Sequence, residues 1–169
     1  NQIGILDGGT AGADFSLATG LGLEVAGDVT AGGDIALTSA SAAGITQSGG
    51  VISSTGNGGS ITLEADKISL ASAVTPTVTT ALDGSVLLRP FSNDTGISPG
   101  NEVERISTGT LSLHATGSGA VQINTALDLT GIATTLDLRG ASVEQTAAIT
   151  GVTTLTGAAT AGDFVLDNA

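Results

Sequence analysis

The chain has no cysteine, methionine, tryptophan or tyrosine, and its aromatic side chains are three phenylalanines. The lack of cysteine excludes a disulfide framework and any thiolate metal site. The shortage of aromatic rings leaves little from which to build a sugar-stacking platform or an aromatic core. No continuous apolar run of about 18 residues is present, so we predict no transmembrane helix and no membrane insertion.

Basic side chains are also scarce. The chain has sixteen Asp and Glu residues but only four Lys and Arg residues, which gives a formal net charge of −12 at pH 7. A phosphate backbone would be repelled by such a chain, and so would an anionic membrane surface. We therefore exclude nucleic acid from the expected partners.

Small residues dominate instead. The chain holds 26 Gly, 25 Thr, 24 Ala and 16 Ser, which together make 91 of its 169 residues. The 41 Val, Ile and Leu residues are spread evenly and alternate with polar ones, and the mean hydropathy is positive at +0.37. Alternation of this kind predicts half-buried strands rather than disorder or helices. We expect an all-β protein with a thin aliphatic core.

The strand-like triplets recur at a regular spacing. The first apolar residues of the prominent triplets are separated by 26, 25, 25, 25 and 28 positions along the series Ile35, Ile61, Val86, Leu111, Leu136 and Phe164. About two further short apolar segments lie between neighbours. Three short strands per coil of about 25 residues is typical of a parallel β-helix, or β-solenoid. The length then predicts about seven coils in one solenoid segment covering 1–169.

Two distant stretches repeat the same pattern. Residues 32–52 read "GGDIALTSASAAGITQSGGVI", and residues 133–152 read "ATTLDLRGASVEQTAAITGV". Each has an apolar triplet, a turn of small residues, and a short segment that ends in Gln-Ser or Gln-Thr. Aligning them predicts a duplicated block of about four coils, in which the equivalent pairs are Ile35 and Leu136, Ile45 and Val143, and Ile61 and Phe164. We expect the segment to belong to a longer repetitive chain.

One segment departs from the pattern. Residues 89–107, "RPFSNDTGISPGNEVERIS", hold two of the three prolines and two of the three arginines. We predict a loop that leaves the rod at 89–107. The "GNEVERI" part is compatible with a brief helical turn that has Asn101 as its N-cap.

The order "GSVLLRP…ISPGNEVERISTGTLSLHATGSGAVQI" at 84–123 resembles a recurring block of large bacterial exoproteins of the filamentous haemagglutinin-like, two-partner-secretion family. The stretch "ASVEQTAAITGVTTLTGAATAGDFVLDNA" at 141–169 is similar to the repeats of that family. The resemblance extends from about Asp28 onward. It implies a right-handed β-helix, secretion through an outer-membrane partner, and display on the bacterial cell surface in adhesion, biofilm or filaments.

Candidate chemical residues are few, and we assign no catalytic, cofactor-binding or metal-binding residue. His114 is the one histidine, and a structural or surface role is its simplest interpretation. Acids at the turns, such as Asp34 and Asp163, would suit Ca²⁺ if they shared a corner, although turn preference explains them more simply. Ion pairs within a loop account for the dense group Arg89, Arg105, Glu102 and Glu104 better than a catalytic groove does.

The sequence therefore favours a non-enzymatic, structural and adhesive function: a stiff, secreted β-helical rod. Its expected partners are glycans or proteins of a host cell, a neighbouring cell or a matrix. The alternative is a fibre subunit that associates end to end through uncapped coil edges. A glycan-active β-helix enzyme is the outside alternative. Ice binding by Thr-x-Thr pairs at 75–80 and 152–157 is a further one, although these pairs do not recur at the coil spacing.

Overall fold

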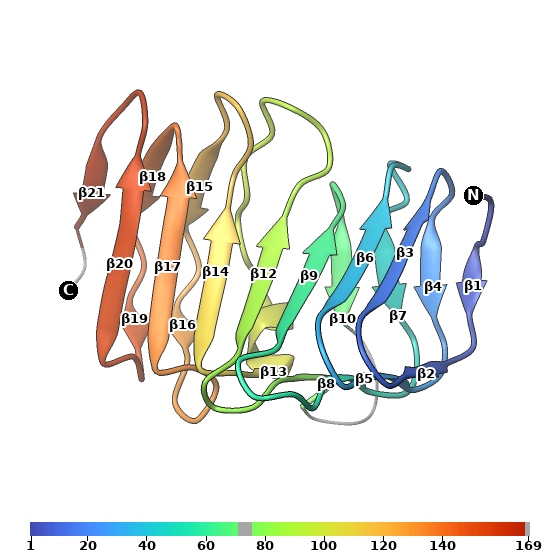
Figure 1. The fold of residues 1–169 in the computed structure, drawn as a ribbon. Coiled ribbons are helices and arrows are strands. Elements are labelled where there is room, and N and C mark those ends of the chain that lie inside the picture. Colours follow the sequence, from blue (N-terminus) through green and yellow to red (C-terminus); the bar gives the residue numbers. More distant parts are fainter. Residues whose placement is uncertain (71–75, 168–169) are drawn as a thin grey trace.

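The chain winds into a rod in which most strands lie beside the equivalent strand of a neighbouring turn (Figure 1). The computed structural model describes residues 1–70 and 76–167. They form a β-solenoid of about seven turns, with about 22 residues in a turn. Each pairing between strands is parallel, as in Phe15 with Ile35 and Leu111 with Leu136. The prediction of an all-β parallel solenoid with three short strands per turn is confirmed.

The turns build three faces. The long face is one seven-stranded sheet, made of β3 (Phe15–Thr19), β6 (Ile35–Ser39), β9 (Ser60–Glu64), β12 (Ser85–Arg89), β14 (Thr110–His114), β17 (Thr135–Gly140) and β20 (Thr154–Ala159). The second face follows it in each turn and has two sheets, β1 (Ile5–Leu6), β4 (Leu23–Val25), β7 (Ile45–Gln47) and β10 (Ile68–Leu70), then β15 (Ala120–Ile123), β18 (Ser142–Gln145) and β21 (Phe164–Leu166). The third face has β2 (Gly9–Ala11), β5 (Val29–Ala31), β8 (Ile52–Ser54), β11 (Val78–Thr79) and β13 (Ile106–Ser107), then β16 (Leu127–Asp128) and β19 (Ile149–Thr150).

The register of the long face confirms most of the predicted series and corrects its last member. Ile35, Ile61, Val86, Leu111 and Leu136 are successive Cα partners. The next partner is Leu155 instead of Phe164, which pairs with Val143 on the second face. The turn that ends at Leu155 takes 19 residues, whereas the four turns from Ile35 to Leu136 take 25 or 26. A fixed step of about 25 residues therefore passes over the last strand of this face.

The same register tests the proposed duplication. Ile35 and Leu136 occupy the long face, and Ile45 and Val143 both follow it on the second face, in β7 and β18. The third pair is wrong, because Ile61 lies on the long face and Phe164 lies on the second. The echo between the two stretches therefore reflects the same order of faces over one turn. It does not extend through the whole block.

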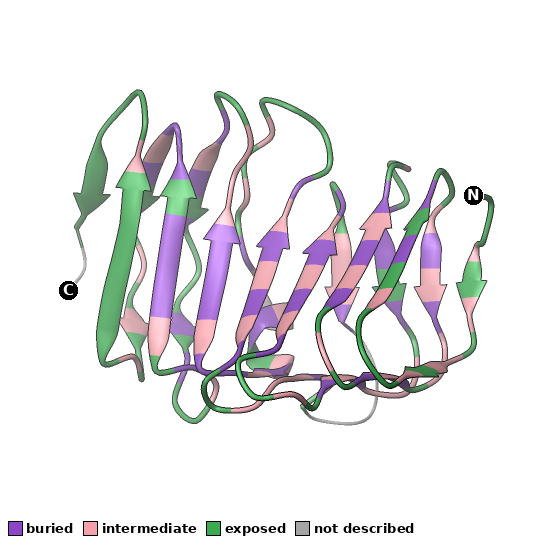
Figure 2. Cartoon of the chain, in the orientation of Figure 1, coloured by how far each residue is buried: buried purple, intermediate pink, exposed green. Residues whose placement is uncertain are grey.

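The core is one continuous cluster of aliphatic side chains enclosed by the three faces, in which the side chains of successive turns stack in columns. Leu63, Leu88, Leu113 and Leu138 are successive partners in the sheet and are 2% exposed or less. Burying such a side chain contributes about 1.5–3 kcal/mol. Figure 2 shows this buried stripe along the middle strands, whereas β20 and β21 at one end are exposed. Stacked turns thus bury what one turn alone would leave in water.

Buried glutamines explain the recurring Gln at the ends of second-face segments. Gln47 is 0% exposed, and its Nε2 donates to the carbonyl oxygens of Gly50 and Thr77 at 3.0 Å each. Gln145 Nε2 donates to the Ala147 carbonyl at 2.9 Å in the equivalent corner. A side-chain amide here satisfies carbonyl groups where the chain turns and the strand ladder stops.

The second face is divided at the segment 90–105. Ile97 forms one isolated parallel bridge with Val121, and residues between 90 and 100 rise from the rod as a loop (Figure 1). The 3₁₀ helix η1 (Asn101–Arg105) follows, contacts β10 and β16, and buries Val103. The expected helical turn is present, but its N-cap is Gly100 and not Asn101. Glu102 Oε1 accepts a hydrogen bond from the Gly100 N–H at 2.8 Å, and this contact stabilises the first turn of the helix.

Among the described residues, no helix has the length and apolar character that a membrane crossing requires. The two Thr-x-Thr stretches lie on different faces, because β11 belongs to the third face and β20 to the long face. Thr77 is also buried, and residue 75 lies outside the described ranges. A continuous threonine array of the kind needed to bind ice is therefore not formed by these two segments.

Candidate functional site

The outward side of the long face carries a row of polar and ionisable side chains, which we call the polar row. It consists of Thr38, Glu64, Arg89, His114 and Arg139, one from each of five successive strands. Strand alternation puts these residues outside because the leucine before each of them points into the core. Of the five Lys, Arg and His side chains in the chain, three are in this row.

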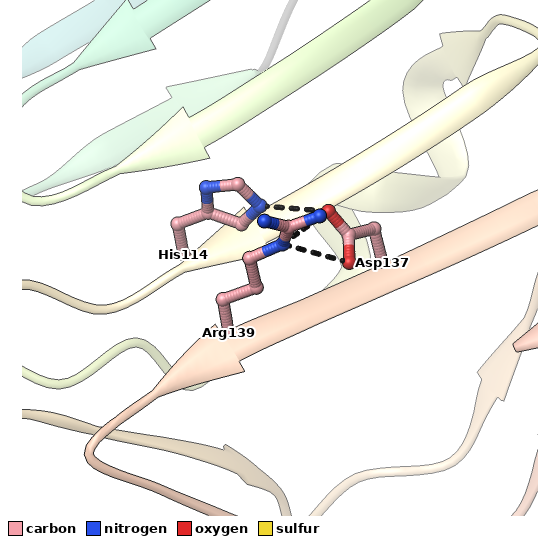
Figure 3. Close-up of polar contacts among 3 residues, drawn as sticks. All are labelled: His114, Asp137 and Arg139. Carbon is pink, nitrogen blue, oxygen red and sulfur yellow. Dashed lines mark hydrogen bonds and ion pairs between the residues drawn. The ribbon is translucent and has the colours of Figure 1, made fainter. Parts of the chain in front are cut away.

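Asp137 is the centre of the polar contacts near one end of the row (Figure 3). Its Oδ2 lies 3.0 Å from His114 Nε2, and Arg139 Nε donates to Oδ2 at 2.9 Å and to Oδ1 at 3.1 Å. The Asp137 residue is 6% exposed although it points outward, because the long side chains of its neighbours cover it. The carboxylate is therefore held in one place by two charged or polar partners.

A second cluster lies farther along the row. Arg89 Nη2 is 2.9 Å from Glu64 Oε1, and the Thr38 hydroxyl donates to Glu64 Oε2 at 3.3 Å. We expected Arg89 to pair with acids of its own loop, and this was wrong. The ion pair joins two turns instead, because Glu64 and Arg89 are Cα partners in adjacent strands. The row thus links neighbouring turns by charge as well as by backbone hydrogen bonds.

Ser112, His114 and Asp137 are the residue types of a hydrolytic triad, and they are neighbours in β14 and β17. The geometry does not match that of a triad. A catalytic histidine uses one ring nitrogen for the carboxylate and the other for the serine hydroxyl. Within the described part of the chain, His114 Nε2 faces Asp137 and no hydrogen bond joins His114 to Ser112. The cluster is arranged as a charge-neutralising contact.

The sequence reasoning found His114 but missed its partner. Asp137 is 23 residues away, so no adjacent acid is visible in the sequence. The repeat could have located it, because Ser112 and Asp137 are Cα partners at the 25-residue step of the long face. Side chains one step apart on the outward side of parallel strands lie about 4.8 Å apart.

Replacing Asp137 with Asn should lower the free energy of unfolding by about 1–3 kcal/mol. The amide keeps the size of the side chain but removes the charge that Arg139 and His114 share. Chemical denaturation followed by circular dichroism measures the change, and Asp83→Asn, in an exposed turn, is the matched control for loss of one negative charge. Equal stability of the two variants would contradict a structural role of the contact.

Aspartates at the corners of the rod accept hydrogen bonds from the next turn. Asp34 Oδ1 accepts the Ser60 N–H at 2.8 Å, and Asp28 Oδ1 accepts the Val51 N–H at 2.9 Å. The same contact, in which a corner carboxylate accepts an N–H from a residue 20 to 26 positions later, is made by Asp14 to Asp34, Asp66 to Ser92 and Asp94 to Ser118. These carboxylates therefore continue the ladder where the strands stop.

The Ca²⁺ hypothesis required Asp34 and Asp163 to share a corner. Asp34 precedes β6 on the long face, whereas Asp163 precedes β21 on the second face. Over residues 1–70 and 76–167, no group of three or more potential ligands among His, Cys, Asp and Glu comes together. The corner contacts to backbone N–H groups give these acids a structural explanation.

Hydrogen bonds accepted by three aspartates predict acid sensitivity. Hydrogen bonds from Ser92 lower the pKa of Asp66, those from Ser118 lower the pKa of Asp94, and those from Thr130 lower the pKa of Asp128. A lowered pKa in the folded state stabilises the fold above the unfolded pKa of about 3.9, and this stability is lost as the pH falls through the folded value.

The combined variant Asp66→Asn, Asp94→Asn and Asp128→Asn should therefore lose less stability than the wild type between pH 7 and pH 2. The reason is that an amide oxygen still accepts the N–H and does not titrate. Thermal melts across that pH range measure the difference. An acid-induced loss of the same size in both proteins would contradict the prediction.

These features define the protein by architecture as a β-solenoid whose turns are joined by inward aliphatic stacking and outward polar contacts. No protein-family model, curated protein or solved structure matches the chain.

Proposed function

We propose that the chain is a structural and adhesive segment of a large secreted bacterial surface protein, in which a stiff rod presents loops to other surfaces. The observation that supports this most is the unbroken seven-stranded sheet from β3 to β20. At about 4.8 Å between strands it extends about 29 Å along the rod. A rod of this kind is compatible with a spacer. Secretion through an outer-membrane partner rests on the sequence resemblance.

The loop after β12 is the part of the rod that we propose makes contacts. Phe91 is 42% exposed there, and an exposed aromatic ring is a common anchor of interaction surfaces. The partners would be glycans or proteins of a host cell, a neighbouring cell or a biofilm matrix.

The proposal can be tested by measuring how well beads coated with the chain are retained on cultured cells and on biofilm matrix. We expect retention of the beads and a loss of retention with Phe91→Ala. The matched control is Leu82→Ala, because Leu82 is an equally apolar side chain, 84% exposed at another corner. Wild-type beads that bind no better than beads coated with an unrelated acidic protein would overturn the adhesive role.

End-to-end assembly into a fibre is the second candidate, and the apolar side chains of the last described turn are compatible with it. Leu155, Phe164 and Leu166 are in register with inward-facing residues of the preceding turn, yet they are 37–42% exposed. A second copy that stacked on this end would bury them and continue the strand ladders. The side chains exposed at this end are apolar, like those buried in the core.

Negative-stain electron microscopy at several concentrations separates the two candidates. Long filaments that appear as concentration rises would support the fibre, and isolated short rods would support the spacer. Leu166→Lys should abolish filaments because Leu166 is in register with an inward-facing residue. Val165→Lys should not, because the Val165 side chain points outward. Compact particles without a rod shape would contradict both candidates.

A further inference from the structure

A pocket of about 220 Å³ opens where the second face is interrupted. Its walls come from the corner after β9, the end of β12 and the loop at 96–98. In a regular turn a strand would lie on β10 here. Ile97 bridges forward to Val121 instead, so its segment pairs with the next turn and a space is left beside Ile68. The interruption of the sheet creates the pocket.

Two of the four Lys and Arg residues of this acidic chain line the pocket, Lys67 and Arg89. Arg89 Nη2 is taken by Glu64, but its Nε is buried and has no acceptor among the described residues. A buried donor of this kind is unfavourable unless a ligand satisfies it. Lys67 takes part in none of the ion pairs found in the described part of the chain. Lys67 is therefore able to bind an anion in this arrangement, and Arg89 Nε becomes able to do so once its side chain turns toward the pocket.

The acidic side chains at the pocket already accept hydrogen bonds from the protein. Asp66 accepts the backbone N–H and the hydroxyl of Ser92, and Glu102 Oε1 accepts the Gly100 N–H. They hold the loop against the rod, and their remaining lone pairs can accept hydroxyl groups. Ile68 and Ile97 add apolar surface. The lining thus offers cationic donors, hydroxyl acceptors and an apolar wall.

We infer that this pocket binds one hexuronate residue of an acidic glycan, with the carboxylate at Arg89 and Lys67. Such a sugar combines a carboxylate, several hydroxyl groups and an apolar ring face, which match the three parts of the lining. The volume equals that of about seven waters at about 30 Å³ each, which suits a single sugar ring. This inference rests on the proposed adhesive function and names the ligand for it.

Titration of the full chain with sodium D-glucuronate, followed by amide NMR, tests the inference. We expect saturable shifts confined to Lys67, Ile68 and the segment 96–98, with D-glucose producing none. Arg89→Gln should weaken binding at least about tenfold, because a charged hydrogen bond is lost. Arg139→Gln is the matched control, since it removes the same charge from the same sheet face outside the pocket.

A second variant guards against loss of folding in Arg89→Gln. Ser98→Phe introduces a bulky ring at an exposed position of the pocket lining without changing Arg89 or Glu64, and it should also abolish the shifts. Absence of saturable shifts, equal shifts with glucose, or unchanged binding in Ser98→Phe would each overturn the inference.

The bead assay distinguishes this site from the adhesive role as a whole. If beads carrying Arg89→Gln or Ser98→Phe adhere as well as the wild type and glucuronate does not compete, the pocket is not the adhesive site and this inference fails, while adhesion stands. If glucuronate binds in the pocket and wild-type beads do not adhere, the site stands and the adhesive role falls.

Discussion

Leu113→Ala is expected to lower the free energy of unfolding by about 2–5 kcal/mol. Leu113 is 0% exposed and lies between its partners Leu88 and Leu138 in the middle of the leucine column. Removing its side chain leaves a cavity that neighbouring turns cannot close, because their backbones are fixed by hydrogen bonds on both sides. Guanidinium-induced unfolding, followed by far-ultraviolet circular dichroism, measures the loss.

The control for this prediction is Leu87→Ala in the adjacent strand. Leu87 points outward and is half-buried against Thr62 and Ser112, its partners in the sheet. The same truncation should cost less than about 1 kcal/mol there. A larger loss at Leu87 than at Leu113 would mean that the inward and outward sides of the long face have been exchanged. Such a result would contradict the register of the whole rod.

Gly44→Ala is expected to destabilise the protein by about 2–5 kcal/mol. Gly44 has a φ of +73°, which costs an alanine about 1–2 kcal/mol. A Cβ there would also overlap the carbonyl oxygen of Lys67 in the next turn, and relief of such overpacking costs about 1–3 kcal/mol more. Turns must approach closely at this corner, because Ile45 N donates to that same carbonyl at 2.8 Å.

Gly58→Ala separates the two causes. Gly58 has a similar φ of +69°, but an added Cβ would meet no atom within 4 Å. Only the backbone strain of about 1–2 kcal/mol should appear at that position. Thermal melts of both variants provide the comparison. If the two substitutions cost the same, close stacking of turns at the Gly44 corner would be refuted.

The solenoid was predictable because its physical cause is local and repeated. The steps between Ile35, Ile61, Val86, Leu111 and Leu136 are nearly constant, and each residue begins an alternating triplet. Inward stacking of these side chains requires no knowledge of distant contacts. The step to Phe164 failed for the same reason: the last turn is shorter, and the apolar pattern alone does not say which face a triplet occupies.

The candidate sites were less predictable because they depend on residues one turn apart. Nothing near His114 in the sequence points to Asp137, and nothing near Arg89 points to Glu64. Their meeting depends on the exact number of residues between turns. The pocket beside β10 was harder still to predict from the sequence. It forms where Ile97 bridges to Val121 and no described strand pairs with the free edge of β10.

By itself the sequence determined the class of fold, the aliphatic core and the acidic surface, because composition and alternation act on every turn in the same way. The tertiary structure decided which turn each strand joins, how Glu64, Arg89, Asp137 and Arg139 pair, and where the pocket opens. Turn lengths between 19 and 28 residues set these outcomes. A change of one residue in a turn moves a side chain to the other side of its strand, and the register is selected by stacking between turns.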